Sequence, residues 1–275
     1  MLLLTRTITS IIPRTFILTA SSPSFCAPSL TSIRSSFYRS FMSSVSVTES
    51  ADCLQVQGHV QYDTPDHITP SNVHTSPLEQ FHIWFNEALK ANVREPDAIS
   101  LSTATASGIP SSRMVLFKQL DKRGFVFYTN YTSRKSREME ENPQAALLFF
   151  WREMSRQVRV LGRVEKMSKE ESEEYFKSRP VGTRLGAWAS HQSSVIGEED
   201  LPNRLAEVQE RFGVQASDKE GDVPLPDFWG GWRVIPSEVE FWLGKPSRLH
   251  DRVRYLRVEG SPDDQPRWTI DRLSP

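Results

Sequence analysis

The folded part of the chain is marked by apolar positions whose spacing changes from that of a helix to that of strands. In residues 76–92 apolar side chains recur every three or four positions, which predicts a helix. Ser76 is a candidate N-cap, Pro77 stands at the first helical position, and Glu79 would complete a capping box. From residue 98 onward apolar and polar positions alternate instead, as is typical of strands.

Short turns separate most of the alternating segments, so they predict antiparallel pairing. The predicted strands cover residues 98–105, 111–120, 125–130, 144–153, 156–167, 229–244, 248–258 and 266–273. Further helices are predicted at residues 133–142, 168–179, 182–190 and 201–213. The second of these opens with another capping box, formed by Ser168 and Glu171. The pattern indicates a mainly β protein with α decoration, whose antiparallel sheet is closed or nearly closed into a barrel.

The first 48 residues differ in composition from everything that follows. They are rich in Arg, Ser and Thr, and no acidic residue occurs before Glu49. Such an N-terminus is typical of an organellar transit peptide, with a disordered leader as the alternative. We therefore expect a leader at 1–48, an irregular polar lead-in at 49–75 and one folded domain at 76–275. The expected location is mitochondrial, or cytoplasmic if Met42 serves as an internal start.

Composition excludes several classes of function. The 33 basic and 34 acidic residues leave a net charge of −1, which gives no overall attraction to nucleic acid or to an anionic membrane. The only two cysteines are Cys26 and Cys53, so no disulfide framework or Cys-based metal site can form in the folded domain. Nucleophile, zinc-site and nucleotide-loop motifs are absent from the sequence. Catalysis would therefore depend on a bound organic cofactor.

Positive charge is concentrated in one stretch of this neutral chain. Residues 113–163 contain eleven basic and five acidic residues. Within them, Thr132 or Ser133 can cap a helix whose first turn carries Arg134 and Lys135. Cations at a helix N-terminus oppose the helix dipole by about 0.3–1 kcal/mol, whereas a bound phosphate would gain about 1.5–3 kcal/mol from each charge-assisted hydrogen bond. The pattern favours a phosphate clamp, with a solvated basic surface as the alternative.

A second basic segment lies near the C-terminus, in "PSRLHDRVRYLRV" at 246–258. If the segment is a strand, alternate side chains share a face. Asp251 would then lie on the opposite face, as a candidate partner for a neighbouring strand. Four cationic or titratable side chains on one face need an anionic partner. Those four are Arg248, His250, Arg252 and Arg254.

These segments together resemble the pyridoxamine 5′-phosphate oxidase family, also called the pyridoxine 5′-phosphate oxidase family. The resemblance runs from about residue 77 to residue 275 and rests on eight segments in order: "RMVLFK", "FYTNYTSRKSREMEENP", "FFWREMSRQVRVLGRVEK", "YFKSRP", "GAWASHQSSVI", "WGGWRV", "EFWLGKPSRLHDR" and "IDRLSP". It implies a split β-barrel that binds flavin mononucleotide (FMN) as a homodimer, with each active site built from both chains. It also implies oxidation of pyridoxamine or pyridoxine 5′-phosphate to pyridoxal 5′-phosphate by O2, with release of hydrogen peroxide, and of ammonia from the amine.

The resemblance also implies roles for individual residues and no metal. FMN contacts fall on Arg113, Met114, Val115, Leu116, Tyr128, Thr129, Arg134, Lys135, Gln157, Gln192, Ser193, Trp242 and Arg252. Substrate contacts fall on Lys118, Tyr175, Arg179, Thr183, Arg248, Leu249 and His250, with the first four on the substrate phosphate. Catalysis would depend on positioning, with Arg248 and His250 as the candidate catalytic residues that orient the ring and move protons. His250 could equally hold the substrate without a proton role.

Departures from the family pattern are few. Thr183 stands where the family usually has Ser, and Arg184 with Leu185 stand where it usually has Gln and Ile; Arg184 has no assigned role. Arg254 lies beyond the motif and is expected to be solvated. The segment 213–226 is longer than in many relatives. Two alternatives stay open: another flavin-dependent split-barrel oxidoreductase, or a protein that carries pyridoxal 5′-phosphate without turnover.

Overall fold

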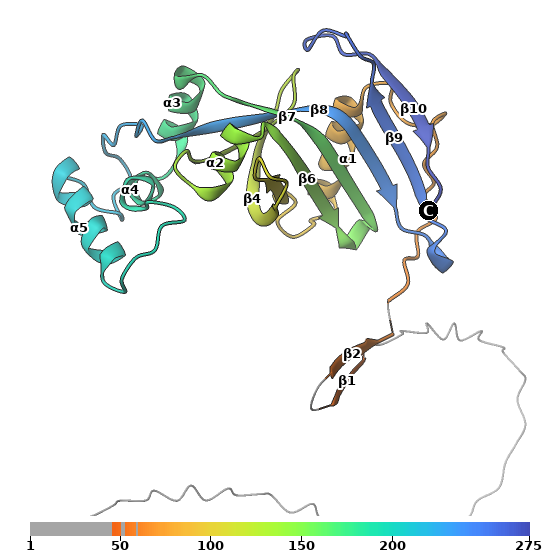
Figure 1. The fold of residues 1–275 in the computed structure, drawn as a ribbon, viewed down its shortest axis with the longest axis horizontal. Coiled ribbons are helices and arrows are strands. Elements are labelled where there is room, and N and C mark those ends of the chain that lie inside the picture. The colour runs from red at the N-terminus through yellow and green to blue at the C-terminus, as the bar shows by residue number, and fades with distance from the viewer. Residues whose placement is uncertain (1–45, 51–52, 59) are drawn as a thin grey trace, which may run out of the picture. The chain divides into compact units, whose positions relative to one another are not determined.

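The computed structural model describes residues 46–50, 53–58 and 60–275 (Figure 1). Nearly all of the predicted leader lies outside the described residues, so the transit peptide stays a prediction. In the lead-in, β1 (Ser46–Ser50) and β2 (Cys53–Gln57) pair as an antiparallel hairpin. The expectation of an irregular segment from 49 to 75 is therefore wrong for these strands, whereas residues 60–75 contain no helix or strand, as predicted.

Six antiparallel strands form a closed barrel in the order β8-β5-β4-β3-β6-β7, which β7 closes by pairing with β8. This confirms the mainly β fold predicted from the alternating pattern. The longest strand, β8, continues past the barrel and pairs there with β9, which pairs with β10. The strands are β3 (Ala98–Ala104), β4 (Pro110–Leu120), β5 (Phe125–Asn130), β6 (Gln144–Trp151), β7 (Arg156–Lys166), β8 (Trp229–Leu243), β9 (Asp251–Arg257) and β10 (Trp268–Arg272).

Helix α1 (Pro77–Lys90) packs its apolar face against the barrel interior. The Phe81 ring lies 4.7 Å from that of Phe149 and 4.9 Å from that of Phe125, centroid to centroid. Ser76 is the N-cap, but its side chain makes no capping bond, so the predicted capping box does not form. Its backbone N–H donates instead to His74 Nδ1. In a capping box this N–H would donate to the Glu79 side chain.

Four more helices complete the domain: α2 (Arg134–Glu141), α3 (Lys169–Ser178), α4 (Val181–Ala189) and α5 (Asp200–Phe212). Ser168 and Glu171 form the predicted capping box of α3, with both of its hydrogen bonds at 3.1 Å. The helices α4 and α5 lie beyond one end of β8, and β9 and β10 lie at its other end (Figure 1). No helix in the described part of the chain is long and apolar enough to span a membrane.

The segment 246–258 is only partly a strand, so the predicted row of four side chains is wrong. Pro246–Arg248 forms a 3-10 turn in which Ser247 and Arg248 have φ values of 57° and 62°, and β9 begins only at Asp251. Arg248 and His250 therefore precede the strand, because left-handed backbone cannot continue a pleat.

Within β9 the alternation holds. Asp251 is buried and accepts a hydrogen bond from Arg272 of β10 at 3.0 Å, which confirms a partner on a neighbouring strand. Arg254 pairs with Asp271 at 2.7 Å, so the expectation of a purely solvated side chain is wrong.

Candidate active site

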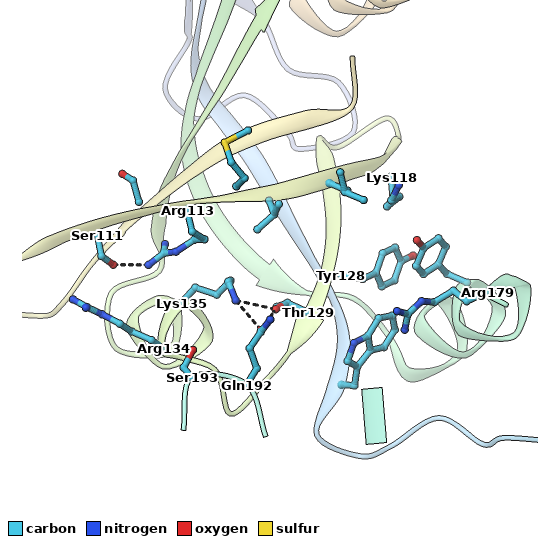
Figure 2. Close-up of a pocket in the computed structure, with 16 residues that line it drawn as sticks. Ser111, Arg113, Lys118, Tyr128, Thr129, Arg134, Lys135, Arg179, Gln192 and Ser193 are labelled. Carbon is cyan, nitrogen blue, oxygen red and sulfur yellow. Dashed lines mark hydrogen bonds between the residues drawn. The ribbon is translucent and has the colours of Figure 1, made fainter. Parts of the chain in front are cut away.

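A cavity of about 620 Å³ opens between strands β4 and β5, helices α2 and α3 and the segment that follows α4 (Figure 2). Most of the residues predicted from the family resemblance line it, although they come from distant parts of the sequence. The predicted residues in its wall are Arg113, Met114, Val115, Leu116, Lys118, Tyr128, Thr129, Arg134, Lys135, Tyr175, Arg179, Gln192 and Ser193.

One end of the cavity is cationic and is built on the start of α2. Ser133 is the N-cap in extended conformation, as the "TSRKS" pattern predicted, but its side chain makes no capping bond. The buried Lys135 Nζ donates to Gln192 Oε1 at 2.8 Å and to Thr129 Oγ1 at 3.2 Å (Figure 2). Burial and the neighbouring Arg113 lower the pKa of Lys135 to about 8. A bound anion would offset both effects, because opposite charge favours the protonated amine.

Two arginines complete this end, one on each side of Lys135 (Figure 2). Arg113 of β4 donates to Thr103 Oγ1 at 2.6 Å, and Arg134 of α2 donates to a carboxylate on its own helix. Because a strand and a helix present them from different sides, the two guanidinium groups and the amine converge on one volume. Such a set can bind a phosphate with several charge-assisted hydrogen bonds.

The other end combines stacked rings with cations. Tyr128 stacks on Tyr175, with centroids 3.9 Å apart, and lies 5.5 Å from the parallel ring of Trp229. The Arg179 guanidinium lies over the Trp229 ring at 4.7 Å, and its buried Nη1 has no hydrogen-bond partner within the described residues. Lys118 pairs with Asp97 at 2.9 Å. Burial lowers the pKa of Arg179, so this end also favours an anionic ligand.

The remaining predicted residues lie elsewhere. Gln157, Trp242 and Arg252 occupy one row across β7, β8 and β9, because Trp242 pairs with both others in the ladders. The His250 ring lies 4.5 Å from that of Trp242, and Tyr62 packs edge-on against both. We call the group of Gln157, Trp242, His250 and Arg252, with the adjacent Arg248, the distal cluster.

The distal cluster cannot reach the cavity of its own chain. Trp229 lines the cavity and Trp242 belongs to the distal cluster, thirteen residues further along β8. At about 3.3 Å per residue, the stretch of β8 between them is about 40 Å long. Leu249 and Thr183 are exposed and do not line the cavity. One chain therefore holds two separate parts of the predicted site.

Sequence reasoning missed some residues of the cavity. Ser111, Ser112 and Trp229 line its wall, and Glu138 lies beneath it. Trp229 opens the "WGGW" segment that was noted only as part of a family motif. Ser111 stands two positions before the predicted Arg113, so alternation along the strand was the available signal for it. Ser112 would lie on the opposite face, with Met114. Nothing in the sequence distinguished Glu138 from the neighbouring acids of α2, because only the packing buries it.

Comparison with known proteins identifies the family. The family model described as pyridoxamine 5′-phosphate oxidase matches residues 85–208, and that of the pyridoxine 5′-phosphate oxidase C-terminal dimerisation region matches residues 229–275. A pyridoxine/pyridoxamine 5′-phosphate oxidase of Bordetella petrii is 54% identical over 200 residues, 73% of this chain and 90% of that protein. A protein of the same name from Trichormus variabilis is 50% identical over 213 residues, 77% of this chain and 94% of that protein.

Solved structures agree. PhzG from Burkholderia lata 383, in complex with tetrahydrophenazine-1-carboxylic acid, has a TM-score of 0.68 and 34% identity and covers 76% of this chain and 98% of its own. An FMN-binding protein from Nostoc punctiforme, with a TM-score of 0.56 and 14% identity over 73% of this chain and 98% of its own, shares the fold. The fold, the match to both family models and identities of 50% or more over most of the chain make this chain an oxidoreductase of the pyridoxamine 5′-phosphate oxidase family.

Proposed function

We propose that this protein binds FMN and oxidises pyridoxamine 5′-phosphate and pyridoxine 5′-phosphate to pyridoxal 5′-phosphate, with O2 as the electron acceptor. The products are hydrogen peroxide and, from the amine, ammonia. The observation that carries the proposal is one cavity with two cationic ends. A flavin phosphate and a phosphorylated substrate are two anions that must be held apart while their rings meet, and the cavity has a separate set of donors for each.

The residues at the α2 end fit the phosphate of FMN. Lys135 is buried among the uncharged oxygens of Thr129, Ser133 and Gln192, so its own contacts include no carboxylate that would compete with a phosphate. Arg113 and Arg134 add guanidinium donors. When bound, FMN would supply the two-electron acceptor that no side chain provides. The protein's own contribution is to bind and orient it.

At the opposite end, Lys118, Tyr175 and Arg179 are the donors proposed for the substrate phosphate. The unpartnered Nη1 of Arg179 supports this assignment, because buried guanidinium donors are normally paired. The ligand in the solved PhzG structure is a carboxylic acid named without a phosphate. Two cations and a phenol match the nearly two negative charges of a phosphate ester better than the single charge of a carboxylate, and this favours the B6 substrates over a phenazine-like one.

We propose further that the functional unit is a homodimer in which the distal cluster of one chain completes the cavity of its partner. The separation of about 40 Å along β8 supports this, because one chain cannot bring both parts to one ligand. A barrel face beside the cavity is apolar and exposed, and a second copy would cover it. On that face Ser100 pairs with Met114 and with Leu148, which are 64% and 36% exposed. The match of residues 229–275 to a dimerisation region agrees.

Arg248 and His250 of the distal cluster are the proposed catalytic residues. His250 Nδ1 accepts a hydrogen bond from the backbone N–H of Lys245 at 3.0 Å. An acceptor nitrogen carries no proton, so the neutral ring holds its proton on Nε2 and can donate from there. We propose that this N–H and the Arg248 guanidinium orient the substrate ring. Proton transfer by His250 is a second role open to the same nitrogen.

The proposal is tested with the full-length protein in air. Purified protein should be yellow, or become yellow when FMN is added, and pyridoxine 5′-phosphate should then yield pyridoxal 5′-phosphate and peroxide in equal amounts. Failure to take up FMN under any condition would refute the proposal. A yellow protein that oxidises neither substrate would be another split-barrel oxidoreductase, and one that only retains pyridoxal 5′-phosphate would be a carrier.

A further inference from the structure

Helix α2 carries a buried carboxylate directly beneath the cationic end of the cavity. Glu138 is only 4% exposed, and its two oxygens serve different elements. Oε1 accepts a hydrogen bond from Arg134 Nε of the same helix at 2.7 Å. Oε2 accepts from Ser111 Oγ at 2.6 Å and from Arg113 Nη2 at 3.4 Å, both on β4, and also from Thr103 Oγ1 on β3. One side chain thus joins a helix and two strands.

The carboxylate is ionised at any pH the folded protein meets. Burial opposes its charge, but hydrogen bonds from Ser111, Thr103 and Arg134 outweigh burial and lower the pKa of Glu138 to about 2. A buried charge with this many donors is a rigid anchor, because moving it would leave several groups unpaired.

A carboxylate next to a phosphate site appears unfavourable, since it would repel the ligand. Its charge is balanced here, because Arg113 and Arg134 both pair with it. Together with Lys135, the three cations and one carboxylate leave two net positive charges. A phosphate monoester carries nearly two negative charges at neutral pH, so the set matches it in charge.

We propose that Glu138 is a positioning residue, which holds Arg113 and Arg134 at the separation and orientation that the phosphate of FMN requires. The inference rests on the proposed function. The Arg134 side chain is 55% exposed and long, so without an anchor it would sample many rotamers. The pairing with Oε1 holds its guanidinium at the start of α2, while Oε2 holds Arg113 against the opposite wall. Because both side chains are already ordered, FMN binding loses less conformational entropy, which is the benefit of preorganisation.

The test compares FMN with riboflavin, which has the same ring and no phosphate, on protein freed of flavin. Dissociation constants follow from quenching of flavin fluorescence. Glu138→Ala should weaken FMN binding about tenfold or more, which corresponds to the loss of one charge-assisted hydrogen bond, and should leave riboflavin binding unchanged. Glu138→Gln should recover most of the FMN affinity, because its amide oxygen can still accept from Arg134. The control is Glu140→Ala, which removes an exposed acid of the same helix that pairs with Lys166 of β7, outside the cavity.

Two results would overturn the inference. One is FMN binding by Glu138→Ala as tight as that of the unmodified protein; the other is an equal loss of riboflavin binding, which would indicate a general defect in folding. If Glu138→Ala does not fold, Thr103→Val removes a donor to the carboxylate, together with an acceptor of Arg113, without changing charge. It should weaken FMN binding several-fold, with riboflavin again unchanged. An unmodified protein that binds no FMN would instead refute the proposed function, so the two failures are distinct.

Discussion

Tyr128 of β5 and Tyr175 of α3 stack face to face, with ring centroids 3.9 Å apart and planes inclined by 15°. The contact joins the barrel to helix α3, which carries the proposed substrate-phosphate donor Tyr175 and ends directly before Arg179. Burial, followed by the nearby Tyr175, raises the pKa of Tyr128 to about 12, so this phenol stays neutral at physiological pH. The two stacked rings form one wall of the cavity.

Removing only the Tyr175 hydroxyl should affect substrate binding and not the chemical step. Tyr175→Phe keeps the stack but loses the proposed donor to the substrate phosphate. We expect KM for pyridoxine 5′-phosphate to rise about tenfold or more with kcat within about twofold, because a hydrogen bond to a charged group contributes about 1.5–3 kcal/mol. Steady-state peroxide release measures both constants. Tyr131→Phe, outside the cavity, is the control, and an unchanged KM for Tyr175→Phe would contradict the assignment.

Variants in the cavity and in the distal cluster should differ in whether they affect flavin retention or turnover. Arg134→Ala is expected to lower flavin retention during gel filtration, since it removes a proposed phosphate donor. Arg248→Ala is expected to leave flavin bound and to reduce turnover by at least about a hundredfold, as the loss of a substrate-orienting group does. The ratio of flavin to protein absorbance and the rate of peroxide formation give the two readouts. Equal losses of both properties in both variants would refute this division.

Shared active sites predict complementation between inactive variants. Arg179→Ala damages the cavity and Arg248→Ala damages the distal cluster, so each homodimer should be nearly inactive. A hybrid dimer would contain one site with both defects and one intact site. The purified hybrid should therefore show about half of the unmodified activity, and an unpurified random mixture about a quarter. Two variants with different affinity tags, co-expressed and purified through both, provide the hybrid. A hybrid no more active than its parents would indicate sites confined to single chains.

The buried amine makes FMN binding pH-dependent. Because the pKa of Lys135 is lowered to about 8, the amine is charged below that pH and increasingly neutral above it. FMN affinity should be nearly constant between pH 6.5 and about 7.5 and then fall by up to about tenfold per pH unit above 8, as binding must take up a proton. Fluorescence titrations across this range measure the slope. The affinity for riboflavin should not decline above pH 8, and in the Lys135→Arg variant the affinity for FMN should not decline either.

The aromatic core should dominate stability. Phe81 is 1% exposed and contacts the rings of Phe117, Phe125 and Phe149 inside the barrel. Phe81→Ala should lower the free energy of unfolding by about 3–5 kcal/mol, through lost burial and an unfilled cavity. Leu89→Ala, on the exposed side of the same helix, should change it by less than about 0.5 kcal/mol. Urea titrations followed by tryptophan fluorescence compare the two. Similar effects would mean that α1 does not fill the barrel as described.

Local sequence patterns predicted helices and strands well wherever tertiary contacts do not change the local hydrogen bonds. The short run of β-branched and aromatic residues at 125–130, which follows the turn at 121–124, predicts β5 with its observed ends. The two capping boxes show the limit of such patterns. Ser168 and Glu171 form theirs, whereas at Ser76 the backbone N–H donates to His74 Nδ1 instead.

The C-terminal segment shows a second limit. A period of two suggested a strand through Arg248 and His250, but the backbone of Ser247 and Arg248 turns left-handed just before β9. Charge alternation cannot reveal such a turn, since alternation describes side chains and not the backbone angles of single residues. Directly before the turn, Lys245 donates to the backbone oxygens of Thr64 and Asp66, which lie far away in the sequence. The same dependence on packing hid Glu138, whose hydrogen-bond donors come from three elements.

The sequence by itself determined the class of fold, the family and the residue types of the site, because strand alternation, helix caps and ordered motifs are properties of neighbouring residues. Tertiary structure decided which of those residues meet. It brought Arg113, Lys135 and Arg179 to one cavity, and it left Trp242 at the far end of β8, about 40 Å further along the strand than Trp229. The cavity does not follow from spacing along the chain, because it depends on strand pairing and on the closure of the barrel. The separation follows only because residues 229–243 form one continuous strand.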